Sequence, residues 1–361
     1  MDSILFSPKN IGNLVLKNRF VRSATHDMLC DKEGFPTKES IFLHNQLAEG
    51  EVGLIIAGVA LVQKAKNNYL MHEDKCIDPW KRITDQVHAR GSAIALQLSH
   101  PGRQALPGMS GLDPIGPSPV PMAHSWPIPR EMTIADIEKM IERYAQSSRR
   151  ASEAGFDAVQ IHAGHGYLIS TFLSPQANIR KDNYGGSTLK RMRFLEEIIA
   201  RIREITGPEY PVMVKLNFND GIEDGLKPDE AADIAERLAE KSVDAIEVTA
   251  GTMASIEKAC PLGISDKKDE ACNREYAAIL KNRVQIPISL VGGNRTPEVM
   301  SALVQSGVTD FVSMCRPLIR EPLLVAEWKN GRLRKAKCIS CNRCLSALQK
   351  GEQPRCQLDI Q

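Results

Sequence analysis

Two histidines and a tyrosine are the residues of this sequence whose types and spacing suit chemistry at an oxygen atom. They occupy His162-Ala163-Gly164-His165-Gly166-Tyr167, directly after the apolar run Phe156–Ile161. Two imidazoles three residues apart on a glycine turn can aim N–H groups at one point and stabilise negative charge there. The phenol of Tyr167 can supply a proton. A zinc site and a pair of surface histidines are the alternatives, although zinc needs three or four ligands and no third stands nearby.

A phosphate-binding pattern follows two other apolar runs. Val291-Gly292-Gly293-Asn294 precedes a helix that starts at Thr296-Pro297-Glu298, and Met314-Cys315-Arg316-Pro317 ends the next run. Glycines let backbone N–H groups approach an anion, and the positive end of a helix favours it. Threonine followed by proline is typical of a helix start. The two loops therefore predict a phosphate site, with simple turn glycines as the alternative.

Two single polar residues end further apolar runs. Lys215 follows Val212-Met213-Val214, where an ammonium group can counter an anionic ring or form a Schiff base. Gln97 offers both an amide donor and an amide acceptor. Taken alone, each is also an ordinary polar residue at the end of a strand.

These residues need elements that bring them together, and eight short apolar runs alternate with amphipathic stretches such as Ile134–Ala154 and Thr188–Ile205. This alternation predicts a closed (β/α)8 TIM barrel, in which active sites lie at the carboxyl ends of the strands. An open doubly wound sheet is the rival, but no G-x-G-x-x-G follows the first strand. The predicted strands are Arg19–Ala24, Val52–Val59, Ala93–Leu98, Ala158–His162, Val212–Asn217, Ala245–Ala250, Ile288–Val291 and Phe311–Met314.

Three segments lie outside the repeat. Ile11–Asn18 alternates around a turn and predicts a small N-terminal hairpin that caps the barrel bottom. Ser99–Met132 contains eight prolines, and a loop this long after the third strand predicts a lid or a pocket wall. We expect residues 1–330 to form the barrel and residues 331–361 to form a short Cys-rich C-terminal extension.

Composition excludes several classes of protein. The 361 residues are 42% hydrophobic and 25% charged, and 46 Lys+Arg against 44 Asp+Glu give a net charge of +2. This balance gives no argument for binding nucleic acid or an anionic membrane surface. No apolar run approaches the roughly 18 residues that span a bilayer, and the first residues lack the basic and apolar regions typical of a signal peptide. We expect a soluble, cytoplasmic protein with free thiols at the scattered cysteines Cys30, Cys76, Cys260, Cys272 and Cys315.

Several of these motifs together resemble the old yellow enzyme family of FMN-dependent oxidoreductases. The longest shared pattern runs from His162-x2-His165-Gly166-Tyr167-Leu168 to Asn178-x-Arg180-x-Asp182-x-Tyr184-Gly185-Gly186. Gln97-Leu98-Ser99-His100-Pro101-Gly102-Arg103 is another shared run. The resemblance covers nearly all of Leu5–Pro322 and is greatest to the barrel portion of the bacterial dienoyl-CoA reductase and trimethylamine dehydrogenase types.

The resemblance implies a role for each matching residue. FMN would lie on the barrel mouth, with His162 and His165 on the substrate carbonyl oxygen and Tyr167 as the proton donor. His26 would lie beside the flavin and the substrate, where relatives commonly carry Thr or Cys, and an imidazole there would stabilise reduced flavin. The implied cofactor-binding residues are Ser23, Ala24, Thr25, His26 and Val59 around the ring, Gln97 and Lys215 at its pyrimidine end, and Gly292, Gly293, Asn294, Cys315 and Arg316 at the phosphate.

Four cysteines crowd the last 24 residues. They are Cys338, Cys341 and Cys344 at two-residue spacing, followed by Cys356. This pattern is typical of [4Fe–4S] ligation, with a four-cysteine zinc site and reduced thiols without metal as alternatives. The dienoyl-CoA reductase relatives carry a similar cluster, although their second and third cysteines are usually one residue further apart.

The resemblance implies an ene-reductase that passes hydride from NAD(P)H through FMN to an activated C=C of an enone or enoyl substrate. Two alternatives on the same fold are an amine or ether dehydrogenase that passes electrons to an iron–sulfur cluster, and an electron-transfer flavoprotein without its own substrate. A phosphosugar barrel without flavin is a further alternative. The expected partners are a small-molecule substrate, an external electron donor or acceptor protein and further copies of the chain, with no nucleic acid and no membrane.

Overall fold

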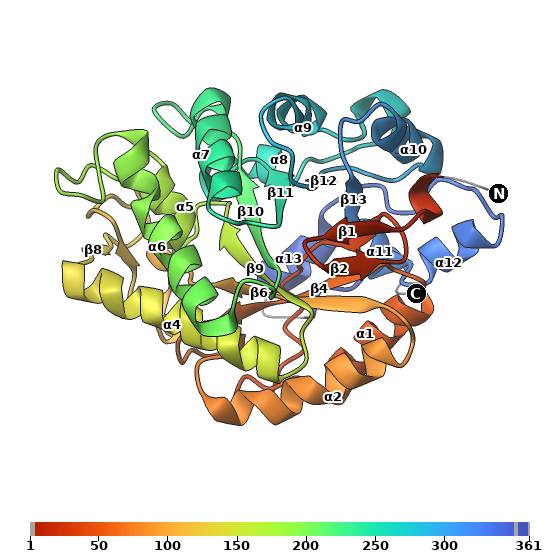
Figure 1. The fold of residues 1–361 in the computed structure, drawn as a ribbon, viewed down its shortest axis with the longest axis horizontal. Coiled ribbons are helices and arrows are strands. Elements are labelled where there is room, and N and C mark those ends of the chain that lie inside the picture. The colour runs from red at the N-terminus through yellow and green to blue at the C-terminus, as the bar shows by residue number, and fades with distance from the viewer. Residues whose placement is uncertain (1–3, 350–352, 360–361) are drawn as a thin grey trace.

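The computed structural model describes residues 4–349 and 353–359, which are built around a closed barrel of parallel strands (Figure 1). The pairing of the last barrel strand with the first, Val312 opposite Phe20, closes the ring. The predicted TIM barrel is thereby confirmed, and every predicted strand is found within a few residues of its expected bounds. In barrel order the strands are β3 Phe20–Arg22, β4 Leu54–Leu61, β6 Ala93–Ser99, β9 Ala158–Ala163, β10 Val212–Asn217, β11 Ala245–Thr249, β12 Ile288–Val291 and β13 Phe311–Met314.

Helices surround the barrel, and local capping fixes where the two predicted ones begin. Thr133 and Asp136 form a reciprocal capping box at the start of α4, and Ser187 accepts a backbone N–H at the start of α6. The longer helices are α1 Lys38–Glu49, α2 Ile77–His88, α4 Ile134–Glu153, α6 Thr188–Thr206, α7 Pro228–Glu240, α9 Arg274–Lys281, α10 Pro297–Gln305 and α12 Leu324–Lys329. The shorter ones are α3 Pro107–Ser110, α5 Leu168–Leu173, α8 Ile256–Ala259, α11 Arg316–Arg320 and α13 Arg343–Gln349. Across the described residues, each helix is too short or too polar to cross a lipid bilayer.

The predicted N-terminal hairpin caps the bottom of the barrel (Figure 1). Strands β1 Lys9–Ile11 and β2 Leu14–Leu16 pair antiparallel around Gly12. Ile11 and Leu16 are fully buried and pack with Phe311, Met213 and other residues of the barrel strands in a core of their own. The apolar seal at this end leaves the carboxyl ends of the strands as the open end of the barrel.

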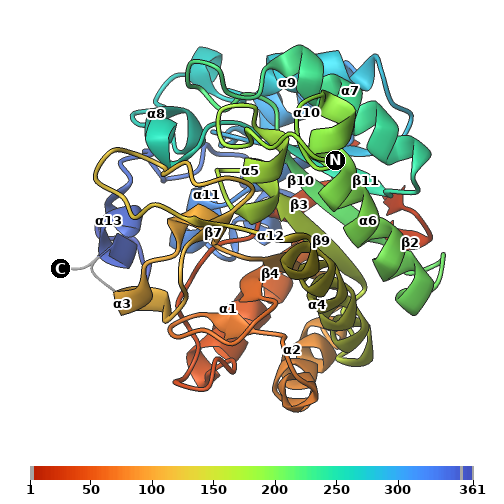
Figure 2. The ribbon, with the colours of Figure 1, turned by 90° about the vertical axis from the view of Figure 1, so that its left-hand side faces the viewer.

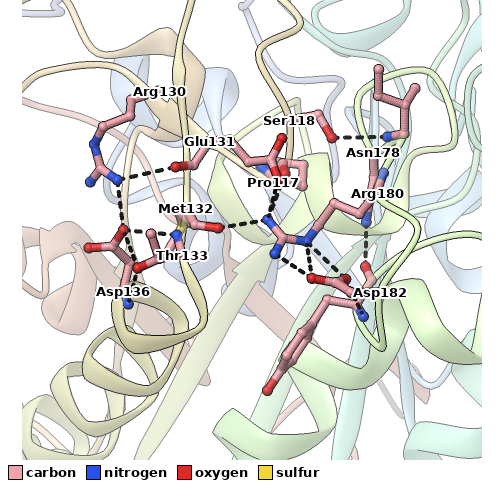
Figure 3. A network of polar contacts seen from close by, with 12 residues as sticks. Pro117, Ser118, Arg130, Glu131, Met132, Thr133, Asp136, Asn178, Arg180 and Asp182 are labelled. Carbon is pink, nitrogen blue, oxygen red and sulfur yellow. Dashed lines mark hydrogen bonds and ion pairs between the residues drawn. The ribbon is translucent and has the colours of Figure 1, made fainter.

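Several hydrogen bonds hold the long loop after β6 against the α5–α6 connection, among them those from Arg103 to Gln176, from Ile179 to Ser118 and from Arg180. Arg180 donates from Nη1 to the backbone oxygens of Pro117 at 2.9 Å and Met132 at 2.7 Å, and pairs with Asp182 at 2.5 Å (Figure 3). The Arg180 side chain is only 5% exposed. Short strands β7 Ile115–Gly116 and β8 Arg130–Glu131 pair within the same loop, and β5 Tyr69–Leu70 pairs parallel with the end of β4.

The C-terminal segment returns to the open end of the barrel. Ala336 donates its N–H to Arg295 at 3.0 Å, and Ser340 accepts one from Gly263 at 3.1 Å. Figure 2 shows α13 on the same side of the molecule as α3 and α8. The Cys-rich extension therefore packs on the barrel rather than apart from it.

Candidate active site

A cavity of about 250 Å³ lies at the carboxyl ends of the barrel strands and is lined by residues of seven of them and by Ser23 directly after β3. Such a position is where barrel enzymes place their chemistry. Every residue that the sequence assigned to flavin or substrate lines this one cavity: Ser23, Ala24, Thr25, His26, Val59, Gln97, His162, His165, Tyr167, Lys215, Gly292, Gly293, Asn294, Cys315 and Arg316. The fold thus brings together residues that are up to about 290 positions apart in the chain.

The two histidines and the tyrosine lie on one tight turn between β9 and α5. The His162 ring centroid is 5.4 Å from that of His165 and 4.7 Å from that of Tyr167. His162 Nδ1 accepts the N–H of Gly164 at 3.3 Å, so a neutral His162 carries its proton on Nε2. His165 Nε2 lies 2.8 Å from the hydroxyl of Thr249, which orients the second ring. Thr249 is the last residue of β11, and the strand-end argument that found Gln97 and Lys215 applies to it equally.

Burial sets the protonation state of these groups. It lowers the pKa of His162 well below its usual value and that of His165 to about 3, with the positive charge of Lys215 acting in the same direction. Burial likewise lowers the pKa of His26 and raises that of Tyr167. At neutral pH the imidazoles are therefore uncharged hydrogen-bond donors, and the phenol keeps its proton.

One end of the cavity carries a lysine held by two neighbours. Lys215 Nζ donates to Ser23 Oγ at 2.9 Å and pairs with Glu247 at 3.1 Å. Gln97, on β6, donates its amide to Gln160 at 2.6 Å. Lys215 and Gln97 thus offer a cation and an amide to a polar ring edge.

The other end of the cavity presents backbone and a second cation. Gly292 and Gly293 adopt φ of +134° and +73°, which side-chain-bearing residues rarely adopt. Arg316 bonds to neutral oxygens, those of Pro261 at 2.8 Å and Asn342 at 2.5 Å. Among residues 4–349 and 353–359 no carboxylate pairs with it, so its charge suits a phosphate.

One part of the predicted phosphate site is wrong. The positive end of α10 is already occupied, because Glu270 accepts the N–H groups of Arg295 at 3.1 Å and Thr296 at 2.9 Å. A phosphate therefore has the glycine loop and Arg316 available, but not the start of this helix. The amide nitrogen of Asn294 is also engaged, since it donates to backbone oxygens of β12 and β13, while its buried Oδ1 has no hydrogen-bond partner in the described chain.

The cavity walls differ from the sequence prediction. No residue of the loop Ser99–Met132 lines the cavity, so the loop does not form a wall of it, and its role as a lid stays a prediction. The loop supports the site from behind, because Gln104 donates its amide to His165 O at 2.7 Å. Two other segments form walls. The segment after β11, which no motif marks, contributes Met253, Ile256, Lys258, Ala259, Cys260 and Pro261, and the C-terminal segment, whose cysteine motif predicted only a metal site, contributes Ser340, Asn342, Cys344, Leu345 and Pro354.

The four clustered cysteines share a second, smaller cavity of about 20 Å³ with Arg316 and Arg320. They are Cys338, Cys341, Cys344 and Cys356, and all four thiols are free. Burial, aided by the nearby Cys315 and Cys338, raises the pKa of Cys344 to about 11. Within the described residues no three ligands are placed to hold a metal ion, so the predicted cluster stays a prediction.

Several known proteins are similar to this chain in sequence. An NADH oxidase from Thermoanaerobacter brockii is 38% identical over 346 residues, which are 94% of this chain and 52% of the relative. An NADPH dehydrogenase from Geobacillus thermodenitrificans is 34% identical over 328 residues, 89% of this chain and 92% of the relative. The chain spans about half the length of the NADH oxidase and of a similarly related metal reductase from Desulforamulus reducens.

Solved structures show the same barrel with its C-terminal segment. A 2-naphthoyl-CoA reductase in complex with 2-naphthoyl-CoA has a TM-score of 0.91 at 27% identity, covering 99% of this chain and 57% of that one. Histamine dehydrogenase from Rhizobium sp. 4-9 has a TM-score of 0.88 at 25% identity, covering 98% and 52%. The family model for NADH:flavin oxidoreductases matches residues 4–335. The chain accordingly belongs to the NADH:flavin oxidoreductase / NADH oxidase family.

Proposed function

We propose that this chain binds FMN in the barrel cavity and uses NAD(P)H to reduce the activated C=C of an enone or enoyl substrate. The observation that carries the proposal is the convergence of two neutral imidazoles, a protonated phenol and two separated cations in a single cavity. Bound FMN supplies hydride transfer. The side chains described below bind and orient the reactants and deliver a proton.

Cofactor binding uses the two ends of the cavity. The glycine loop at Gly292 and Gly293 brings backbone N–H groups close to the phosphate, and Arg316 supplies the neutralising charge. Lys215 and Gln97 hold the pyrimidine end of the ring.

Substrate binding uses the histidine turn. His162 and His165 donate hydrogen bonds to the carbonyl oxygen, which gains negative charge as hydride reaches the conjugated carbon. Their lowered pKa keeps both rings neutral, so the developing charge is met by dipoles already in place. Tyr167 retains its proton and donates it to the neighbouring carbon.

The experiment is a spectrum of the purified protein followed by anaerobic titration. We expect a yellow protein that bleaches with NADH or NADPH and regains colour with a cyclic enone. Tyr167→Phe should still bleach with NAD(P)H but regain colour with the enone about 10²–10⁴ times more slowly. A protein that never retains FMN would rule out the proposal.

The C-terminal segment extends the proposal to a [4Fe–4S] cluster held by Cys338, Cys341, Cys344 and Cys356. The support is that these four thiols line one small cavity and that thiolate ligation needs four cysteines. Iron and acid-labile sulfide in anaerobically purified protein test it, with four of each per chain expected. Zinc in their place would identify the zinc alternative.

An amine dehydrogenase is the second candidate function. Cys344 lines both the main cavity and the cysteine cavity, which suits electrons leaving the flavin for a cluster. The likeness to histamine dehydrogenase points in the same direction. Bleaching by an amine alone, without NAD(P)H, would identify this activity.

A further inference from the structure

A hydrogen-bond network of buried polar side chains crosses the barrel interior behind the cavity. Gln97 Nε2 donates to Gln160 Oε1 at 2.6 Å, and Gln160 Nε2 donates to Glu247 Oε2 at 3.3 Å. The same carboxylate pairs with Lys215 at 3.1 Å, and Lys215 donates to Ser23 at 2.9 Å. Four strands contribute one member each, and Ser23 directly follows β3, so the network links distant parts of the cavity wall.

Glu247 and Gln160 belong to this network but not to the cavity lining. Gln160 lies two residues before His162 on β9, and Glu247 lies two residues before Thr249 on β11. Side chains two apart on a strand share a face, so both residues form the layer directly below the reacting groups. Neither touches the space where a ligand binds, and both are completely buried.

A carboxylate in this position is costly unless it is paired. Glu247 is 0% exposed, and its Oε1 has no hydrogen-bond partner in the described chain. Replacing such an ion pair with apolar residues is often neutral or stabilising, so stability alone does not account for it. The remaining explanation is what the charge does to its neighbours.

The carboxylate of Glu247 determines which group donates and which accepts in each hydrogen bond of the network. An ionised carboxylate only accepts hydrogen bonds, so Gln160 must turn its NH2 group towards Glu247 and its oxygen towards Gln97. Gln97 must then donate to Gln160, which leaves its own carbonyl oxygen free for a ligand. A neutral amide at position 247 can donate or accept, and the order of the two glutamines would no longer be determined.

The carboxylate also offsets the charge of the lysine. Lys215 is 5% exposed, and Glu247 is its ion-pair partner among the described residues. A ring that gains negative charge at this end therefore meets a paired ammonium rather than a free one. At a few ångströms and low effective dielectric, the difference in electrostatic energy between a paired and a free ammonium is large compared with thermal energy.

We infer that Glu247 is a positioning residue that sets both the charge Lys215 presents to the flavin and the orientation of the Gln97 amide. The inference rests on the proposed FMN site. It assigns to a side chain outside the cavity a control over how strongly the bound flavin favours a negative charge.

Sulfite titration of FMN-loaded protein at pH 6.5 tests the charge, because sulfite adds to oxidised flavin and leaves it negatively charged. Glu247→Gln should bind sulfite about ten- to a hundredfold more tightly than wild type, because a negative charge has been removed close to the ring. Glu247→Asp keeps the charge and should restore the wild-type affinity to within about threefold. Asp310→Asn is the matched control, since it removes a buried carboxylate paired with Lys281 at 2.6 Å at the opposite end of the barrel.

Gln160→Met tests the orientation separately and leaves every charge in place. It should weaken FMN binding about fivefold, the loss of one oriented hydrogen bond, and leave sulfite affinity within about twofold of wild type. Equal sulfite affinity in Glu247→Gln and wild type overturns the inference, as does an equal change in Asp310→Asn. Wild-type protein that binds no FMN overturns the proposed function and this inference together. Equal sulfite affinity in Glu247→Gln and wild type, or an equal change in Asp310→Asn, leaves the proposed function standing.

Discussion

The imidazole rings of His162 and His165 lie almost perpendicular, with planes at 88° and centroids 5.4 Å apart. In the function proposed above, rings at this angle would approach the substrate oxygen from different directions, whereas stacked rings would compete for the same approach. It depends on a backbone that few residues adopt, because His165 has φ of +58° and is followed by Gly166 at +77°. The backbone of the turn is therefore strained, and this strained conformation places the two rings, as is common at functional sites.

Removing one of these donors should impair turnover far more than folding. His162→Ala is expected to lower kcat/KM for an enone about 10²–10³-fold, the usual cost of losing one oxyanion donor. The rate of bleaching by NAD(P)H should change much less, since this half-reaction does not use the substrate oxygen. Steady-state and stopped-flow kinetics separate the two. His72→Ala, a histidine that lies outside the cavity lining, is the control, and an equal loss in both variants would contradict the assignment.

Stability should depend on pH through the buried histidines. Burial lowers the pKa of His100 and His165 to about 3, and that of His162 well below normal. Below about pH 6.5 the unfolded chain binds protons that the folded chain does not, so the free energy of unfolding falls as the pH drops towards 3. Each histidine contributes up to about 1.4 kcal/mol per pH unit in that window. Denaturant unfolding at pH 7.5, 5.5 and 4.5 measures the trend, and a His100→Gln variant should show a shallower slope.

The glycine loop gives a test of cofactor binding that is matched for backbone strain. A Cβ at Gly292 would lie 2.6 Å from Cys272 Sγ and 2.8 Å from Asn273 Nδ2, which itself holds Val291 O. We expect Gly292→Ala to weaken FMN binding at least about tenfold, since displaced side chains disturb the loop that approaches the phosphate. Fluorescence titration of FMN into the apoprotein measures the effect.

Gly307→Ala is the control for that experiment. Gly307 also has a positive φ, +74°, but a Cβ there meets no atom within 4 Å. It should cost about 1–3 kcal/mol of stability through backbone strain, yet bind FMN as wild type does. Equal loss of FMN in both alanine variants would mean that strain, and not the phosphate loop, causes the effect.

Local patterns predicted the barrel, the histidine turn, the two phosphate loops, Gln97 and Lys215. The resemblance to the family alone implied Ser23, Ala24, Thr25, His26 and Val59. Parallel barrel strands are short apolar runs, and a polar residue at a strand end must reach the mouth. Thr249 obeys the same rule and was missed only because a threonine at the end of an apolar strand is common. The pattern of residues could therefore have supplied the partner of His165.

The cavity walls and the helix end could not be predicted in this way. Glu270 reaches the start of α10 from a loop 25 residues earlier, and no local spacing signals that approach. The segment from Met253 to Pro261 and the C-terminal segment become walls only through the path of the folded chain. Length and proline content favoured the loop Ser99–Met132 instead, but these features describe a long ordered connection and not where it lies.

Arg180 contributes two buried hydrogen bonds to the contacts that hold that loop, and its replacement should loosen the loop. The guanidinium is buried and donates to two backbone oxygens, those of Pro117 and Met132, which would lose their partners in Arg180→Met (Figure 3). Leaving each of these buried carbonyls unpaired should cost about 1–3 kcal/mol. Asp182 adds little to that cost, since its side chain is 39% exposed and water can solvate it. Arg180→Lys keeps the charge but not the planar fork, so it should recover only part of that loss. Thermal unfolding measures the cost, and hydrogen exchange should show faster exchange confined to residues 101–132.

Arg193→Met is the control, since this arginine makes an exposed i,i+4 pair with Glu197 that is worth about 0.5 kcal/mol. Uniform loss of protection across the barrel, or a cost as small as that of Arg193→Met, would show that Arg180 does not hold the loop in place.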